Sequence, residues 1–122
     1  MLKRNMDLIR EILLKLEEKE NDFVGPLEIE GYEQKDISYQ IGLLHDAGLI
    51  SDLDDLTHMG SQGKEYWPDR LTWEGHEFLE ASRDKNRWDQ AKQTMVEKSG
   101  GIAFSVFRQL LLELTKRAVF GT

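Results

Sequence analysis

The chain has 122 residues, a formal net charge of -7 and no cysteine. Hydrophobic residues make up 39% of it and charged residues 32%, so a folded domain with a core is expected and global disorder is not. The lack of cysteine excludes disulfides, cysteine nucleophiles and cysteine-ligated zinc. No run approaches the roughly 18 apolar residues of a membrane span. The opening residues also lack the features of a secretory signal, and we expect a cytoplasmic protein that binds no membrane.

The charge is distributed unevenly along the chain. Residues 1–80 hold 8 Lys and Arg against 19 Asp and Glu, a balance of -11, whereas residues 81–122 hold 8 against 4, a balance of +4. We therefore divide the chain into a domain at 1–82 and a C-terminal helical extension at 83–122. Duplex DNA prefers basic surfaces, because Lys and Arg contacts to phosphate supply much of the binding free energy. The acidic balance of the first part counts against DNA as its partner.

Helical spacing of apolar residues predicts a first helix that Asn5 or Asp7 caps and that ends near Lys19. One apolar stripe runs along it, made of Ile9, Ile12, Leu13 and Leu16. Residues 27–30, LEIE, then alternate with period two, which predicts a short edge strand.

The most informative segment is 37–50, ISYQIGLLHDAGLI. It predicts a helix over about 33–47 whose buried face holds Ile37, Ile41 and Leu44, followed by Gly48 as a left-handed stop. The opposite face is expected to expose six residues: Gln34, Lys35, Ser38, Gly42, His45 and Asp46.

Residues 49–71 predict a β-hairpin whose tip lies at 60–63, and an aspartate-rich run at 52–55 crowds its first arm. Thr72 is expected to cap the next helix, in which Gly75 allows close packing. A helix ending in a glycine turn, a hairpin and a further helix are typical of one fold. The predicted class is α+β and mostly helical: a winged helix-turn-helix with a small β-hairpin wing and extra C-terminal helices.

Two helices are expected in the extension, one through about Lys98 and one over 102–119. Trp88 is expected in the core, as is Trp73 in the preceding helix. The apolar stripe of the last helix is either an intramolecular core or a dimer contact. Because it runs for about five turns, longer than a winged-helix core usually needs, we predict a homodimer. The residues expected at the dimer interface are Phe104, Phe107, Leu111 and Leu114.

Three segments carry a family resemblance: RNMDLIREILLKLE, DISYQIGLLHDAGLI and RLTWEGHEFLEASRDKNRWDQAK. Over nearly its whole length the chain resembles the bacterial and prophage-encoded proteins of domain of unknown function 2513. The resemblance implies a winged-helix-like fold and no established activity. Likeness to the wider winged-helix superfamily implies base reading by the exposed face of the second helix and phosphate contacts by the hairpin.

Under that likeness, the candidate DNA-binding residues on the second helix are Gln34, Lys35, Ser38, Tyr39 and His45. Those on the hairpin and its return arm are Gln62, Lys64 and Arg70. We expect a DNA-binding transcriptional regulator of bacterial or prophage origin. The alternative is a protein–protein interaction module whose acidic surface binds a host or phage protein. A merely solvated helix face explains the same polar residues.

Catalysis has little support in the sequence. No nucleophile elbow, phosphate-binding loop or pair of histidines at close helical spacing is present. The three histidines, His45, His58 and His76, do not form a metal signature. We expect no enzyme activity, no metal and no cofactor.

Overall fold

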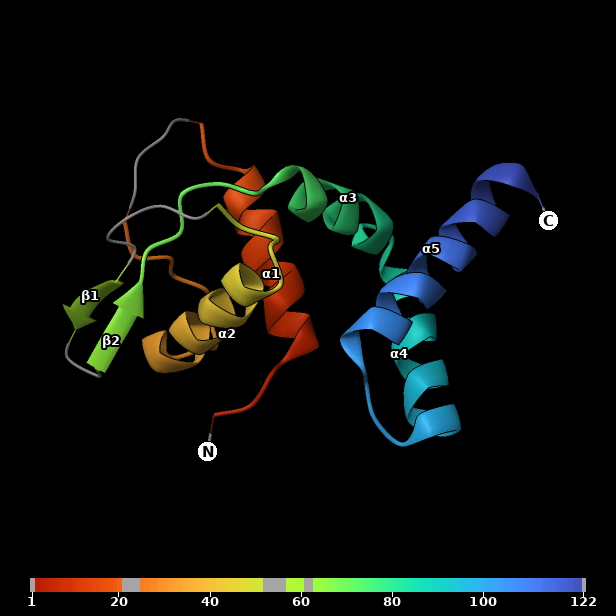
Figure 1. The fold of residues 1–122 in the computed structure, drawn as a ribbon, viewed down its shortest axis with the longest axis horizontal. Helices are drawn as coiled ribbons and strands as arrows, with labels where there is room; N and C mark the ends of the chain where they lie inside the picture. Colours follow the sequence, from red (N-terminus) through yellow and green to blue (C-terminus); the bar gives the residue numbers. More distant parts are fainter. Residues whose placement is uncertain (1, 21–24, 52–56, 61–62, 122) are drawn as a thin grey trace. The chain divides into compact units, whose positions relative to one another are not determined.

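The computed structural model describes residues 2–20, 25–51, 57–60 and 63–121, and within them the chain is mostly helical (Figure 1). The five described helices are α1 Met6–Glu17, α2 Gln34–Asp46, α3 Trp73–Ser82, α4 Lys85–Ser99 and α5 Phe104–Phe120. The two described strands are β1 Thr57–Gly60 and β2 Gly63–Tyr66. Contacts divide the chain into two compact units, Met1–His76 and Glu77–Thr122, so the division lies within α3. The charge balance of the sequence had predicted the boundary between the two parts after Ser82.

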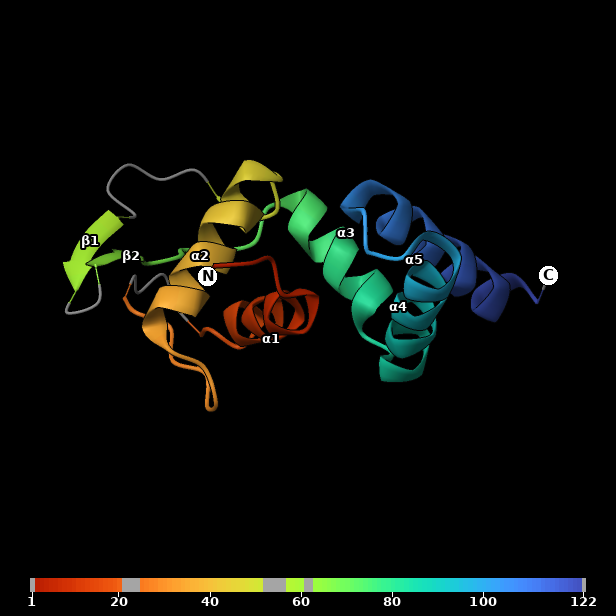
Figure 2. The same ribbon diagram turned by 90° about the horizontal axis from the view of Figure 1, so that it is seen from below.

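The first helix forms as its sequence predicts. Asn5 is the N-cap, and its side-chain oxygen accepts a hydrogen bond from the Leu8 backbone N–H at 3.1 Å. All four residues of the predicted stripe are buried, together with Met6 and Leu8. Figures 1 and 2 both place α2 between α1 and the β1–β2 hairpin, so α1 and α2 share the core of the first unit.

The predicted edge strand at 27–30 is wrong, because these residues lie in no strand. The Leu27 carbonyl accepts a hydrogen bond from the Gln34 side-chain amide at 2.6 Å. The Ile29 carbonyl accepts one from the Tyr32 N–H at 3.2 Å, closing a turn through Gly31 at φ +91°. A side chain of α2 and a local turn therefore take the carbonyls that a strand would offer to a neighbouring strand.

The second helix confirms the prediction for its buried face. Ile37, Ile41 and Leu44 are buried, and Gly48 follows in the left-handed region at φ +76°. The Leu49 N–H donates to the Leu44 carbonyl at 3.0 Å, which turns the chain back towards the core.

A short antiparallel ladder follows that turn. Ile50 and Leu71 form a β-bridge, and the Ser51 N–H donates to the Arg70 carbonyl at 2.9 Å. Further out, β1 pairs with β2 from Thr57↔Tyr66 to Gly60↔Gly63. The last pair, Gly60↔Gly63, lies where the sequence predicted the strands to end, and residues 61–62 of the predicted tip lie outside the described residues. The paired strands are shorter than the predicted arms. The aspartate-rich run at 52–55 lies outside the described residues.

Thr72 and Gly75 join the end of α2 to the start of α3. The Thr72 hydroxyl donates to the Gly48 carbonyl at 2.6 Å and accepts from the Gly75 N–H at 3.0 Å. A Cβ on Gly75 would lie 2.0 Å from the Leu49 carbonyl oxygen, well inside contact distance. The predicted cap and the predicted close packing are both confirmed, and the Leu-Thr-x-x-Gly pattern is explained by these contacts.

The second unit is built around aromatic side chains. Trp88 of α4 is fully buried and meets Phe107 of α5 edge-on, with ring centroids 4.9 Å apart. Phe78 packs against Trp88 at 6.2 Å and against Phe104 at 5.2 Å. The prediction for Trp88 is confirmed, whereas Trp73 is 77% exposed and its predicted place in the core is wrong. Trp73 occupies the first turn of α3, ahead of the turns that carry the buried Phe78 and Leu79.

The stripe on α5 is part of this intramolecular core. Phe107 and Leu111 are completely buried, and Leu114 is half-buried. The prediction that Phe107 and Leu111 form a dimer surface is therefore wrong, because α4 already covers α5 on this side. None of the described helices has both the length and the apolar character that crossing a membrane requires.

Candidate nucleic-acid interface

The outward face of α2 can be located from its buried face. Counting about 100° per residue from Ile37, the side chains of Lys35, Tyr39 and Asp46 lie roughly opposite the core. Lys35 and Asp46 are exposed and Tyr39 is half-buried. This outward face carries one cation, one anion and one aromatic hydroxyl, and both the cation and the tyrosine are among the predicted DNA-binding residues.

The hairpin packs against one flank of that face. The Tyr66 N–H of β2 donates to the Ser38 hydroxyl at 3.2 Å, and a Cβ on Gly42 would lie 3.3 Å from the Tyr66 ring. Ser38 is only 3% exposed. The prediction that Ser38 lies on an exposed helix face is therefore wrong, because β2 covers it and uses its hydroxyl as an acceptor.

Two further predicted residues are only partly available to a partner. Gln34 is half-buried, with its amide donating to the Leu27 carbonyl. His45 is half-buried near the end of α2. Of the hairpin residues, Gln62 and the side chain of Lys64 lie outside the described part, and Arg70 is exposed beyond the end of β2.

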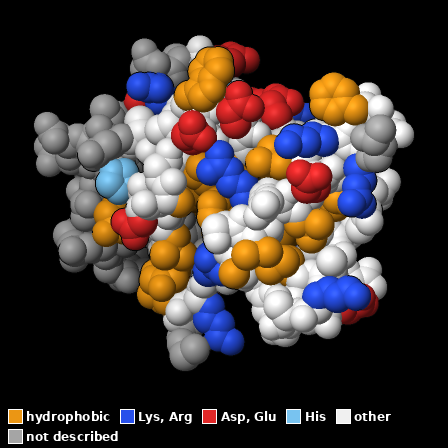
Figure 3. Space-filling model, turned by 45° about the vertical axis from the view of Figure 1, so that its right-hand side comes forward, with side chains coloured by type: hydrophobic (Ala, Val, Ile, Leu, Met, Phe, Trp, Pro, Cys, Tyr) orange, Lys and Arg blue, Asp and Glu red, His pale blue; other side chains and the backbone are white. Residues whose placement is uncertain are grey.

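Lys35 and Arg70, the two described cations among the predicted DNA-binding residues, each have an acidic neighbour. Lys35 Nζ lies 3.4 Å from Glu33 Oε2, and Arg70 Nε lies 4.0 Å from Asp69 Oδ2. The Lys35–Glu33 pair is exposed on both sides, and such pairs are weak, so a phosphate can compete for Lys35. Figure 3 draws Lys and Arg side chains among Asp and Glu side chains, and several acidic side chains lie close together near the top of the view.

The sequence reading missed Gln40, which is 2% exposed. Its Oε1 accepts a hydrogen bond from the Asn5 N–H at 2.8 Å, and its Nε2 donates to the Lys3 carbonyl at 2.7 Å. One signal was available: at three residues after Ile37, Gln40 sits beside the buried stripe, where an amide needs partners.

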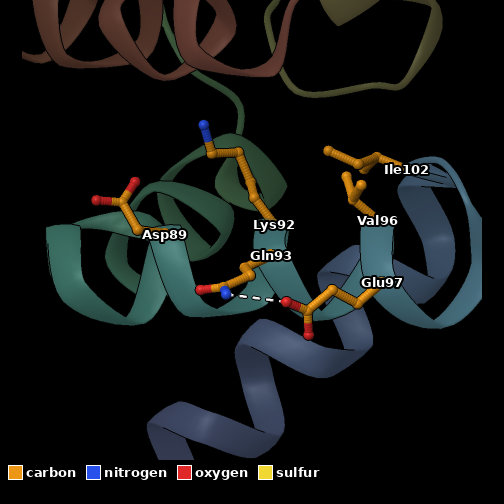
Figure 4. A pocket seen from close by; sticks show the side chains of 6 residues that line it. All are labelled: Asp89, Lys92, Gln93, Val96, Glu97 and Ile102. Carbon is orange, nitrogen blue, oxygen red and sulfur yellow. Dashed lines mark hydrogen bonds between the residues drawn. The ribbon is translucent and has the colours of Figure 1, made fainter.

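A shallow hollow of about 520 Å³ lies along α4 and the turn that follows it (Figure 4). It is lined by Asp89, Lys92, Gln93, Val96, Glu97 and Ile102. Its polar groups bind each other or their neighbours: the Gln93 amide donates to Glu97 at 2.9 Å, and Asp89 pairs with Lys85 at 2.9 Å. In the part of the chain described, no three His, Asp or Glu side chains are grouped closely enough to hold a metal ion.

The chain matches a known protein family. The family described as "Hypothetical protein (DUF2513)" matches residues 3–101. An "Uncharacterized protein" of Haemophilus influenzae is 35% identical over 113 residues, which cover 89% of this chain and 92% of that protein. No solved structure matches the chain.

Proposed function

Because the chain belongs to the DUF2513 family and its Haemophilus influenzae relative is uncharacterised, we propose a function from the geometry of the first unit. We propose that this unit is a winged helix-turn-helix that binds duplex DNA as a bacterial or prophage transcriptional regulator. In this proposal α2 is the recognition helix and the β1–β2 hairpin is the wing.

One observation carries the proposal: the hairpin contacts α2 along the flank that holds Ser38 and Gly42, and the adjoining face with Lys35 and Tyr39 stays open. A recognition helix needs such an open face to enter the major groove, and a neighbouring β-ribbon is placed to meet the backbone beside it. Lys35 and Tyr39 are the proposed base- or phosphate-contacting residues of the helix, and Arg70 and Lys64 are the proposed phosphate contacts.

The test compares Lys35→Ala with Lys15→Ala in a fluorescence anisotropy titration against labelled duplex at low salt. The two lysines are well matched, since their side chains are 53% and 48% exposed and each lies beside a glutamate. We expect Lys35→Ala to lower the affinity about tenfold and Lys15→Ala to leave it unchanged. A wild-type chain that binds no genomic fragment at micromolar concentration would refute the proposal, as would equal affinities for the two variants.

The second candidate function is a protein-interaction module. It is favoured by the -11 balance of residues 1–80 and by the acidic neighbours of Lys35 and Arg70. Asp46→Lys separates the two candidates, because the reversal acts on the outward face of α2. It should strengthen binding to a polyanion such as DNA and weaken binding to a basic protein, and both are measurable by titration with a DNA duplex and with a basic polypeptide.

We also propose that the protein is not an enzyme and uses no cofactor. Among the polar groups around the hollow on α4, Gln93 binds Glu97 and Asp89 pairs with the neighbouring Lys85. A binding function accounts for the exposed residues of α2 without any reacting group.

A further inference from the structure

We infer that residues 2–5 form a basic strap along α2, and that Lys3 and Arg4 bind backbone phosphate beside the recognition helix, with Gln40 as the positioning residue. The inference rests on the proposed DNA-binding function. It adds Lys3 and Arg4 as phosphate contacts and Gln40 as the residue that anchors their backbone. The observation behind it is the buried side-chain amide of Gln40.

A buried amide is costly unless its polar atoms are satisfied. Gln40 satisfies both of its own with backbone groups of the strap: its oxygen accepts from the Asn5 N–H at 2.8 Å, and its nitrogen donates to the Lys3 carbonyl at 2.7 Å. These two groups lie on either side of Arg4. The backbone is therefore anchored before and after Arg4, and Asn5 is further fixed because its side chain caps α1.

The anchoring places the strap on a particular side of α2. The two hydrogen bonds to Gln40 hold Lys3 and Asn5 beside α2, and Figure 2 shows the chain running from there to the start of α1. Counting about 100° per residue around α2, Ser38 and the hairpin lie on one side of the Lys35–Tyr39 face and Gln40 lies on the other. The hairpin therefore borders the outward face on one flank. On the opposite flank the strap is held at Gln40, next to the buried stripe, and the half-buried Asp36 and Leu43 lie between Gln40 and the outward face.

The side chains of the strap suit a polyanion. Leu2, Lys3, Arg4 and Asn5 are all exposed, and two of these four consecutive residues are cations. Cations are few in the acidic first part of the chain. Two of them, Lys3 and Arg4, are nevertheless held next to the helix proposed to enter the groove. Segments that flank a recognition helix contact phosphate or the adjacent groove in other DNA-binding folds, so the arrangement has a physical use.

The experiment measures the affinity of the full chain for a labelled random-sequence duplex between 50 and 200 mM salt. Each phosphate contact contributes roughly 0.9 to the slope of log affinity against log salt. Lys3→Ala/Arg4→Ala should therefore lower the slope by about 1.8, whereas Lys15→Ala/Lys116→Ala, which removes the same charge from α1 and α5, should leave it unchanged. Gln40→Leu tests the anchor: it should speed amide exchange at Asn5 and should reduce the further effect of Lys3→Ala/Arg4→Ala on the slope.

The strap is refuted if the wild-type chain binds the duplex and Lys3→Ala/Arg4→Ala binds with the wild-type slope, a result that leaves the proposed function intact. If the wild-type chain binds no duplex, the proposed DNA-binding function and the strap are both refuted. A loss of fold does not obscure the result, because Lys3 and Arg4 are exposed and circular dichroism of their double variant reports any unfolding directly.

Discussion

Thr72, the residue before α3, and Gly75, in the first turn of α3, show how much the first unit depends on single atoms. Gly75 packs its backbone against the Leu49 carbonyl, and Thr72 bonds both to Gly48 and to Gly75. Together they hold the start of α3 against the end of α2. The Ile50–Leu71 bridge lies directly beside Leu49 and Thr72. The contacts of Thr72 and Gly75 therefore fix the base of the proposed wing.

Gly75→Ala should destabilise the protein by about 3 kcal/mol, because the new methyl group would lie 2.0 Å from the Leu49 carbonyl oxygen and the backbone must move. Urea unfolding followed by circular dichroism measures the change. Gly101→Ala is the control, since nothing lies within 4 Å of its added Cβ and its φ is not positive. Equal midpoints for the two variants would contradict the close packing.

Thr72→Val should cost about 1 to 2 kcal/mol, because it removes the hydroxyl that caps α3 while keeping the shape of the side chain. Thr72→Ser retains the hydroxyl and should stay closer to the wild type. Thermal unfolding of the three chains makes the comparison, and a Val variant as stable as the Ser variant would show that the hydroxyl has no role.

At the scale of elements, the aromatic cluster holds α4 and α5 together. Trp88 is buried between Phe78 and Phe107, whereas Trp73, only fifteen positions earlier, is 77% exposed. Trp88→Ala should cost about 3 to 5 kcal/mol, and Trp73→Ala should change stability by less than about 0.5 kcal/mol. Denaturant unfolding monitored by tryptophan fluorescence distinguishes them, and similar costs would mean that Trp73 is packed as well.

Element positions followed from the sequence where local patterns were strong. Apolar periodicity located the helices, the two glycines at 60 and 63 located the hairpin tip, and Gly48 located the end of α2. The edge strand at 27–30 failed because alternation alone cannot say whether a partner strand is present. Gln34 reaches the Leu27 carbonyl instead, and only the folded chain brings that amide there.

At the scale of the whole molecule, the homodimer remains a prediction, but its surface has to change. Phe107 and Leu111 are buried within the second unit, whereas α5 still exposes Val106, Leu112, Val119 and Phe120. We expect any self-association through α5 to use Leu112 and Val119, which are seven residues apart on one side of the helix.

Leu112→Ser/Val119→Ser should shift the chain towards the monomer in sedimentation velocity, without loss of fold, because both side chains are at least 40% exposed. Phe107→Ser is the contrasting variant and should unfold the second unit, since it removes a ring from the core. If the double variant sediments like the wild type, α5 does not mediate an interface.

By itself, the amino-acid sequence determined the helices and the glycine turn after α2, because each depends on neighbours along the chain. It also indicated the family and, through the Leu-Thr-x-x-Gly pattern, the cap at Thr72 and the close packing at Gly75, whose partners Gly48 and Leu49 lie more than twenty residues earlier. Only the tertiary structure decided which polar residues face outwards. It buried Ser38 under β2, joined Gln40 to the segment before α1, and left Trp73 exposed. The physical reason is that burial depends on contacts between segments distant in sequence, and helical periodicity assigns a residue to a side of its helix without saying what covers that side.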